Sequence, residues 1–106
     1  MDEIEYHVEV SRTSAKKLAA HVAFLARVNN AAAWRLHNEI FSDIRSLKNS
    51  PSSHVRYYSR RFPDRVLRRK ISAKRYLVVF NIEESQKLVT VVDVQDCRQD
   101  IDKNLV

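Results

Sequence analysis

The residues best suited to chemistry lie in one basic segment of the chain. From His54 to Arg75 the sequence holds nine lysines and arginines and one acid, Asp64, a net charge of +8. Arginine binds phosphate through a planar fork, and aromatic rings stack on unpaired bases. The aromatic residues interleaved with these cations are Tyr57, Tyr58 and Phe62. The pattern indicates a surface for a polyanion or an acidic protein, with single-stranded RNA a natural ligand; a solvated, solubilising strand face is the alternative.

The positive charge is local. The 106 residues include 19 Lys+Arg and 13 Asp+Glu, a formal charge of +6. Because the basic segment alone carries +8, the remainder is slightly acidic, at −2. A charge confined to one segment favours a binding role over a general contribution to solubility.

Other kinds of site are excluded by composition. The chain has no glycine and one cysteine, Cys97. Walker loops, dinucleotide fingerprints, nucleophile elbows and EF-hand loops all need glycine. A lone cysteine cannot form an intramolecular disulfide or a cysteine-based zinc site. We therefore expect neither a metal nor a cofactor.

Length and composition predict the class of protein. A chain of 106 residues that is 44% hydrophobic and 30% charged is typical of a soluble globular protein, and we expect a single domain over residues 1–106. Its apolar runs are too short to cross a membrane. The acidic start, Met1-Asp2-Glu3, argues against a signal peptide, so a cytoplasmic location is expected.

The first half of the chain predicts a strand followed by two helices. Alternating apolar and polar residues favour a strand over 3–10. Apolar residues at three- and four-residue steps then favour helices over about 15–28 and 31–47, separated by Asn29-Asn30. Helices joined so closely fold back as an antiparallel hairpin. The predicted core stripe of the first helix is Ala15, Leu18, Val22, Leu25 and Val28.

The second half predicts an irregular arm or short strand over 55–62 and then three strands, over 65–71, 76–82 and 88–94. The fold class is therefore α+β, with the order β-α-α-β-β-β. The helix hairpin is expected to cover one face of a mainly antiparallel, twisted, four-stranded sheet. We expect the opposite face to form an open hollow lined by Arg68 and Lys70, which share one face of their strand.

These elements and several short motifs resemble the RelE/ParE superfamily of type II toxin–antitoxin toxins, also known as plasmid-stabilisation proteins. The resemblance covers nearly the whole chain. Its motifs are Val-Glu-Val-Ser at 8–11, Ala15 and Leu18, Ile40, Ile44, Leu47 and Pro51, Arg-Val-Leu-Arg-Arg-Lys at 65–70, Tyr-Leu-Val-Val-Phe at 76–80, and Val-x-Asp-x-Arg-Gln at 94–99.

The resemblance implies a growth-inhibiting toxin with one of two mechanisms. RelE-like members cleave messenger RNA on the ribosome, and ParE-like members poison DNA gyrase. Both are neutralised by an acidic antitoxin that wraps the toxin, so a hetero-oligomer with the antitoxin, or a homodimer, is expected. The dense cations favour metal-independent mRNA cleavage; a gyrase inhibitor without chemistry and an inactive member that binds only its antitoxin are the alternatives.

The residues that the resemblance assigns to catalysis are Arg68, Lys70 and Arg98. Further contacts to nucleic acid are expected from Arg61, Arg65 and Arg75. The sequence departs from the ribonuclease pattern because Asp96 replaces a common histidine and no tyrosine or histidine follows Arg98. His54 offers another acid or base, entering from the arm. Whether the chain is an enzyme therefore stays open.

Overall fold

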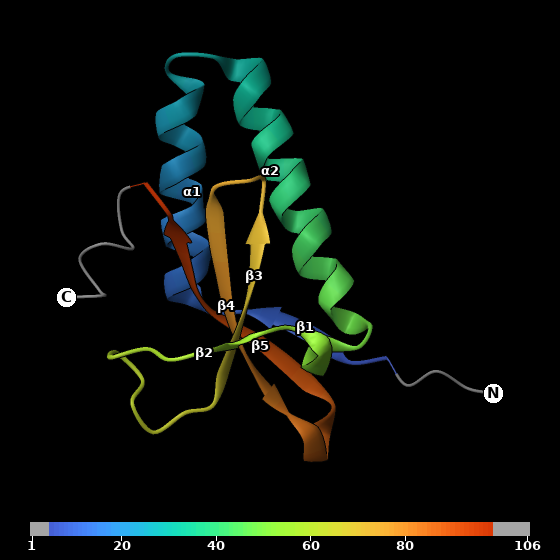
Figure 1. Ribbon diagram of the computed structural model, residues 1–106. Coiled ribbons are helices and arrows are strands. Elements are labelled where there is room, and N and C mark those ends of the chain that lie inside the picture. Colours follow the sequence, from blue (N-terminus) through green and yellow to red (C-terminus); the bar gives the residue numbers. More distant parts are fainter. Residues whose placement is uncertain (1–4, 99–106) are drawn as a thin grey trace.

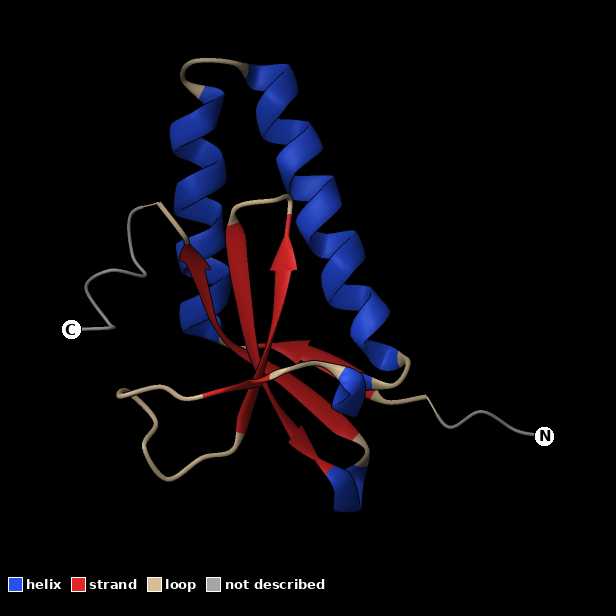
Figure 2. Cartoon of the chain, in the orientation of Figure 1, coloured by secondary structure: helices blue, strands red, loops and turns tan. Residues whose placement is uncertain are grey.

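A computed structural model of the protein describes residues 5–98 and shows two layers, a helix hairpin packed on one face of a twisted sheet (Figure 1). This confirms the predicted α+β class and the hairpin. The two helices are α1, Arg12–Ala26, and α2, Asn30–Arg45. Both extend past the end of the sheet, so the connection between them projects from the molecule (Figure 2).

The sheet has five strands in the order β1-β5-β4-β3-β2, so the prediction of four strands was one short. The additional strand is only two residues long and lies in the segment 55–62, for which an irregular arm or a short strand was predicted. β1 pairs with β5 in parallel, and all other neighbours are antiparallel. The strands are β1, His7–Val10; β2, Arg56–Tyr57; β3, Leu67–Ser72; β4, Tyr76–Glu83; and β5, Leu88–Asp96.

Both helices begin at a polar cap. The Ser11 side chain accepts a hydrogen bond from the Ser14 backbone N–H at 3.1 Å, and the Asn29 side chain accepts one from the Ala32 N–H at 3.0 Å. These bonds satisfy donors that the first helical turn leaves without a partner. α2 passes into a short 3₁₀ turn, Ser46–Lys48, and Pro51 follows at the start of another. The proline prevents the helix from continuing.

The main core lies between the hairpin and the sheet. Leu18 of α1 and Ile40 of α2 are fully buried against Phe80 and Val78 of β4. The predicted stripe of α1 is too long, because Ala15 is exposed and the Val28 side chain, in the projecting connection, is 80% exposed. The sheet ends before it reaches Val28.

The turn between β3 and β4 uses unusual backbone conformations. Ala73 and Lys74 have φ angles of 52° and 65°. They are the central residues of a turn that the Arg75 N–H closes by donating to the Ser72 oxygen at 3.2 Å, and glycine or asparagine is the usual choice at such positions. A chain without glycine therefore makes this turn at a cost in backbone strain.

Candidate functional site

The sheet face opposite the helices, called here the open face, is partly covered. Residues 58–66, called here the arm, form the loop between β2 and β3, which extends to the lower left of the sheet in Figure 1. A small apolar cluster on this face is completed by partly buried Tyr57 and Phe62. Its buried members are Leu67, Leu77, Val79 and Val92. The prediction of an open hollow here was wrong, because Tyr57 of β2 and Phe62 of the arm cover these side chains.

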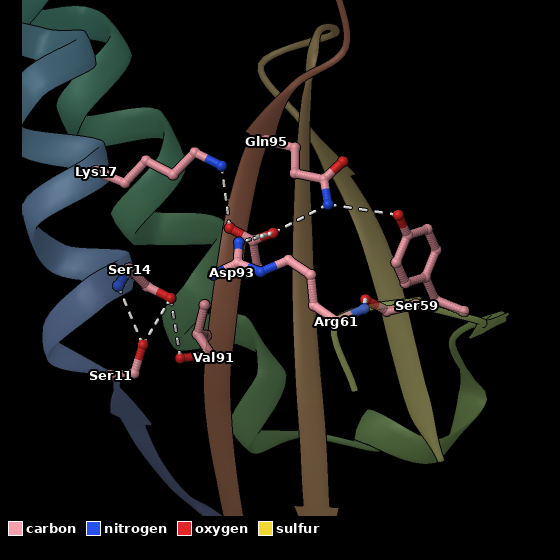
Figure 3. Close-up of polar contacts among 9 residues, drawn as sticks. Ser11, Ser14, Lys17, Ser59, Arg61, Val91, Asp93 and Gln95 are labelled. Atoms are coloured by element: carbon pink, nitrogen blue, oxygen red, sulfur yellow. Dashed lines mark hydrogen bonds and ion pairs between the residues drawn. The ribbon is translucent and has the colours of Figure 1, made fainter. Parts of the chain in front are cut away.

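A carboxylate lies at the centre of a polar network beside this cluster (Figure 3). Asp93 of β5 is 3% exposed. Its Oδ1 lies 3.2 Å from Lys17 Nζ of α1, and its Oδ2 lies 3.4 Å from Arg61 Nη1 of the arm. Gln95 donates to Asp93 Oδ2 at 3.0 Å and to the Tyr57 hydroxyl at 3.4 Å. Three elements distant in sequence are thus tied to β5 at one point.

A β-bulge brings Asp93 to the open face. Phe80 pairs with Val91, but the preceding residue of β4, Val79, pairs with Asp93. The extra residue on β5, Val92, breaks the alternation, so Asp93 and Gln95 share the face of Val79. A bulge redirects every later side chain of its strand.

The network leaves one buried polar atom unsatisfied. Gln95 is 2% exposed, and its Oε1 has no hydrogen-bond partner among the residues that the structure describes. A buried acceptor without a partner costs about 1–3 kcal/mol. Gln95 donates to Asp93, which pairs with Arg61 of the arm, and to Tyr57 of β2. The unsatisfied oxygen therefore belongs to a side chain that helps to hold the arm and β2 against the sheet.

Arg68 and Lys70 share one face of β3 as predicted, but it is the face toward the helices. They pair with Phe80 and Val78, both members of the main core. The predicted placement in the open hollow was therefore wrong. Leu67, Arg69 and Ile71 lie on the other face of the strand, where Tyr57 and Phe62, and not the hairpin, cover Leu67.

His54 joins these two cations. Arg68 Nη1 donates to the His54 backbone oxygen at 2.7 Å, and the His54 ring packs edge-on against Phe80 at 5.8 Å between ring centroids. Burial, followed by the charges of Lys70 and Arg68, lowers the pKa of His54 below 6.5. A neutral imidazole beside two cations is a possible proton acceptor.

Arg98 lies apart from this cluster. It follows β5, and β4 separates β5 from β3. Its backbone N–H donates to Asp96 Oδ1 at 2.9 Å, while Arg75 forms an ion pair with Asp96 Oδ2. Asp96 thus contacts both the backbone of Arg98 and the side chain of Arg75. Burial alone would raise the pKa of Asp96, but the hydrogen bonds from Arg75 and Arg98 outweigh it, and the pKa lies below its usual value.

The three predicted nucleic-acid contacts have different surroundings. Arg61 is paired with Asp93 and Arg75 with Asp96, so a carboxylate neutralises each. Arg65 is exposed and lies over the Phe62 ring at 5.3 Å. Arg65 is therefore the one of the three that remains available to an external anion.

Sequence reasoning missed the residues that hold the arm, above all Lys17, Asp93 and Gln95. The doublet Val91-Val92, which interrupts the alternation of β5, was the available signal for the bulge. No comparable sequence signal pointed to Lys17, because a lysine beside the apolar stripe of a helix is ordinarily solvated.

Burial is the main cause that raises the pKa of the Cys97 thiol, so this side chain is a poor nucleophile. Within residues 5–98, no three histidine, cysteine or acidic side chains are grouped in a way that would hold a metal ion. In the same part of the chain, no helix has the length and apolar character needed to cross a membrane.

Comparison with known proteins identifies the family. Residues 8–101 match the model of the ParE toxin of the type II toxin–antitoxin system parDE. A search of curated proteins finds no match. Among solved structures, the toxin–antitoxin complex RelBE2 from Mycobacterium tuberculosis has a chain that is 13% identical, with a TM-score of 0.56, over 90% of this chain and 97% of that one.

A second solved structure is the archaeal RelE–RelB complex from Pyrococcus horikoshii OT3. Its similar chain is 17% identical, with a TM-score of 0.53, over 90% of this chain and 98% of that one. At such low identity these two likenesses establish the fold. The family match covers most of the sequence, and the chain therefore belongs to the ParE toxin family of type II toxin–antitoxin systems.

Proposed function

We propose that this toxin inhibits growth by binding a protein target, DNA gyrase, without cleaving RNA. The supporting observation is the separation of the residues expected to catalyse cleavage. Arg68 and Lys70 lie on the helix-facing side of β3, and Arg98 lies beyond β4 at the end of β5. Metal-free cleavage needs a base, an acid and cations around a single phosphate.

The open face supports the same proposal. The buried Asp93 carboxylate lies beside its apolar cluster, and Phe62 of the arm packs against that cluster. The two cations nearest that carboxylate, Lys17 and Arg61, are both paired with it and are therefore less available to a phosphate. As the partner that neutralises the toxin we propose an acidic antitoxin, as in the two RelB–RelE type complexes whose fold this chain shares.

The experiment combines two readouts in one bacterial culture. After induction of the full chain, plasmid supercoiling and gyrase-linked DNA breaks are measured while messenger RNA 5′ ends are mapped. We expect growth arrest with altered supercoiling and intact messages, and inhibition of purified gyrase by the purified chain. Growth arrest with new 5′ ends in translated regions and unchanged supercoiling would overturn the proposal.

One observation favours a second candidate, mRNA cleavage. His54, Arg68 and Lys70 bring a neutral imidazole beside two cations. If this cluster cleaves RNA, new 5′ ends appear on induction and are abolished by His54→Gln or Lys70→Gln. Arg35→Ala, which removes an exposed cation of α2, is the matched control and leaves cleavage unchanged.

A further inference from the structure

A pocket lies where the arm leaves β2 and returns to β3, and its lining includes none of His54, Arg68 and Lys70. Its volume is about 390 Å³, which falls within the range of small-ligand sites. The lining residues that matter here are Arg56, Tyr57, Tyr58, Asp64 and Arg65. We call it the arm pocket.

Its most unusual side chain is Tyr58, which is 83% exposed. The adjacent Tyr57 turns inward, where it contacts the small apolar cluster and receives the Gln95 amide. The neighbouring Val66 is 64% exposed and also lines the pocket. An aromatic ring left in water beside an apolar side chain offers a platform on which a planar ligand can stack.

The cations of the arm pocket are free to bind an anion. Within residues 5–98, neither Arg56 nor Arg65 forms an ion pair with an acid, in contrast to Arg61 and Arg75. Arg65 lies over the Phe62 ring at 5.3 Å, which holds its guanidinium beside the pocket. A pre-positioned guanidinium loses less side-chain entropy when it binds a phosphate.

Asp64 adds a hydrogen-bond acceptor to the same lining. Carboxylates accept hydrogen bonds from the exocyclic amino groups of bases. With two arginines and one aspartate, the lining keeps a net positive charge of +1. A stacking ring, two arginines and a carboxylate match the three parts of a nucleotide that are open to recognition when it is unpaired: the base face, the phosphate and the base edge.

We propose that the arm pocket binds an unpaired nucleotide of single-stranded RNA or DNA, stacked on Tyr58 with its phosphates contacted by Arg56 and Arg65. The site binds and does not cleave. The proposal is independent of the mode of growth inhibition, because Tyr58, Arg56 and Arg65 belong neither to the Asp93 network nor to the His54 cluster.

The test measures fluorescence anisotropy of labelled oligonucleotides of about 12 nucleotides with the full chain. Oligo-U, oligo-dT and a mixed-sequence DNA duplex are compared at several salt concentrations. We expect both single strands to bind more tightly than the duplex. The logarithm of the binding constant is expected to fall with the logarithm of salt, by about 0.7 for each phosphate contacted.

Variants distinguish the pocket from general electrostatic attraction. Tyr58→Ala is expected to weaken single-strand binding about tenfold, whereas Tyr58→Phe keeps the stacking face and the affinity. Arg56→Ala is expected to reduce the salt slope by about one phosphate contact. Arg35→Ala removes an exposed cation of α2 and is expected to change affinity little. Circular dichroism verifies that each variant is folded, and the exposure of Tyr58 makes loss of the fold unexpected.

Equal binding of duplex and single strands with no effect of Tyr58→Ala would overturn the proposal. So would binding of polyglutamate without binding of any oligonucleotide, which would make the surface a site for acidic protein. Equal affinity for oligo-U and oligo-dT would support recognition of base and phosphate alone. A preference for oligo-U would support the pocket with an added contact to the 2′-hydroxyl, and identify RNA as the ligand.

Discussion

On the side that faces the helices, the sheet is sealed by long apolar side chains from α1, α2 and β4, whereas the opposite side depends on a small cluster and an arm. Polar contacts follow the same division. On the helix-facing side the Ser72 hydroxyl donates to Asp43 of α2, and on the open side Asp93 gathers cations from α1 and the arm. The helix-facing side is therefore a well-packed scaffold, whereas the cover of the open side is held by few contacts.

The largest expected effect is on the helix-facing side. Phe80 is fully buried among residues of both helices. Phe80→Ala is expected to lower the free energy of unfolding by about 3–5 kcal/mol, because a large cavity forms in a core that cannot collapse around it. Urea unfolding followed by circular dichroism measures the change. A loss below about 1 kcal/mol would show that this core is much looser than its burial indicates.

The next effect concerns Asp96, which is fully buried at the end of β5. Asp96→Asn is expected to destabilise the fold by about 1–3 kcal/mol at pH 7, less than for a fully buried pair because the Arg75 side chain is 35% exposed. The pKa of Asp96 is lower in the folded protein than its ordinary value of 3.8. Its contribution is therefore complete above pH 3.8 and is lost as the pH falls through the folded pKa.

The lowered pKa of Asp96 can be tested by comparing stability at two pH values. Urea unfolding at pH 7 and pH 3 is expected to show a larger loss of stability for the wild type than for Asp96→Asn. Glu39→Gln, which alters an exposed carboxylate of α2, is the control and should follow the wild type. Parallel losses in the wild type and Asp96→Asn would contradict a depressed pKa.

The two sides also differ in how far the sequence predicted them. Apolar periodicity predicted the hairpin and the three long strands, because the main core imposes it. The phase of β3 was not predictable, since Arg68 and Lys70 alternate with Leu67 and Ile71 and either set can turn inward. The deciding factor was the arm, whose cover over Leu67 depends on contacts between distant residues.

The site was predicted less well for the same reason. The basic segment and the cations of β3 were visible in the sequence, but their partners were not. Asp93 reaches the open face only because of the bulge at Val92. His54 approaches Arg68 only because the chain turns at Pro51 toward β3. The positions of Asp93 and His54 both depend on contacts between residues that are distant in sequence, and a local sequence pattern does not predict such contacts.

The open side allows a smaller test of the comparison. Arg61 links the arm to Asp93, and its side chain is 50% exposed. Arg61→Ala is expected to change global stability by less than about 1 kcal/mol, because the Arg61 side chain is half exposed and Lys17 still pairs with the buried Asp93 carboxylate. Local opening of the arm is expected to increase, so trypsin cleaves faster after Arg60 and Arg65 under native conditions. Cleavage as slow as in Arg35→Ala would show that the apolar contacts of Phe62 alone hold the arm.

The smallest expected effect returns to the helix-facing side, at His54. Burial is the main cause of its lowered pKa, and Lys70 is the next. Because the folded state disfavours the charged imidazole, stability falls as the pH drops below the ordinary value of 6.5. Lys70→Gln is expected to raise the pKa of His54 toward 6.5 without restoring it, because the burial and Arg68 remain. An NMR titration of the His54 ring measures this directly. An unchanged pKa in Lys70→Gln would mean that the two charges are screened from each other, and would remove the electrostatic basis for His54 as a proton acceptor beside these cations.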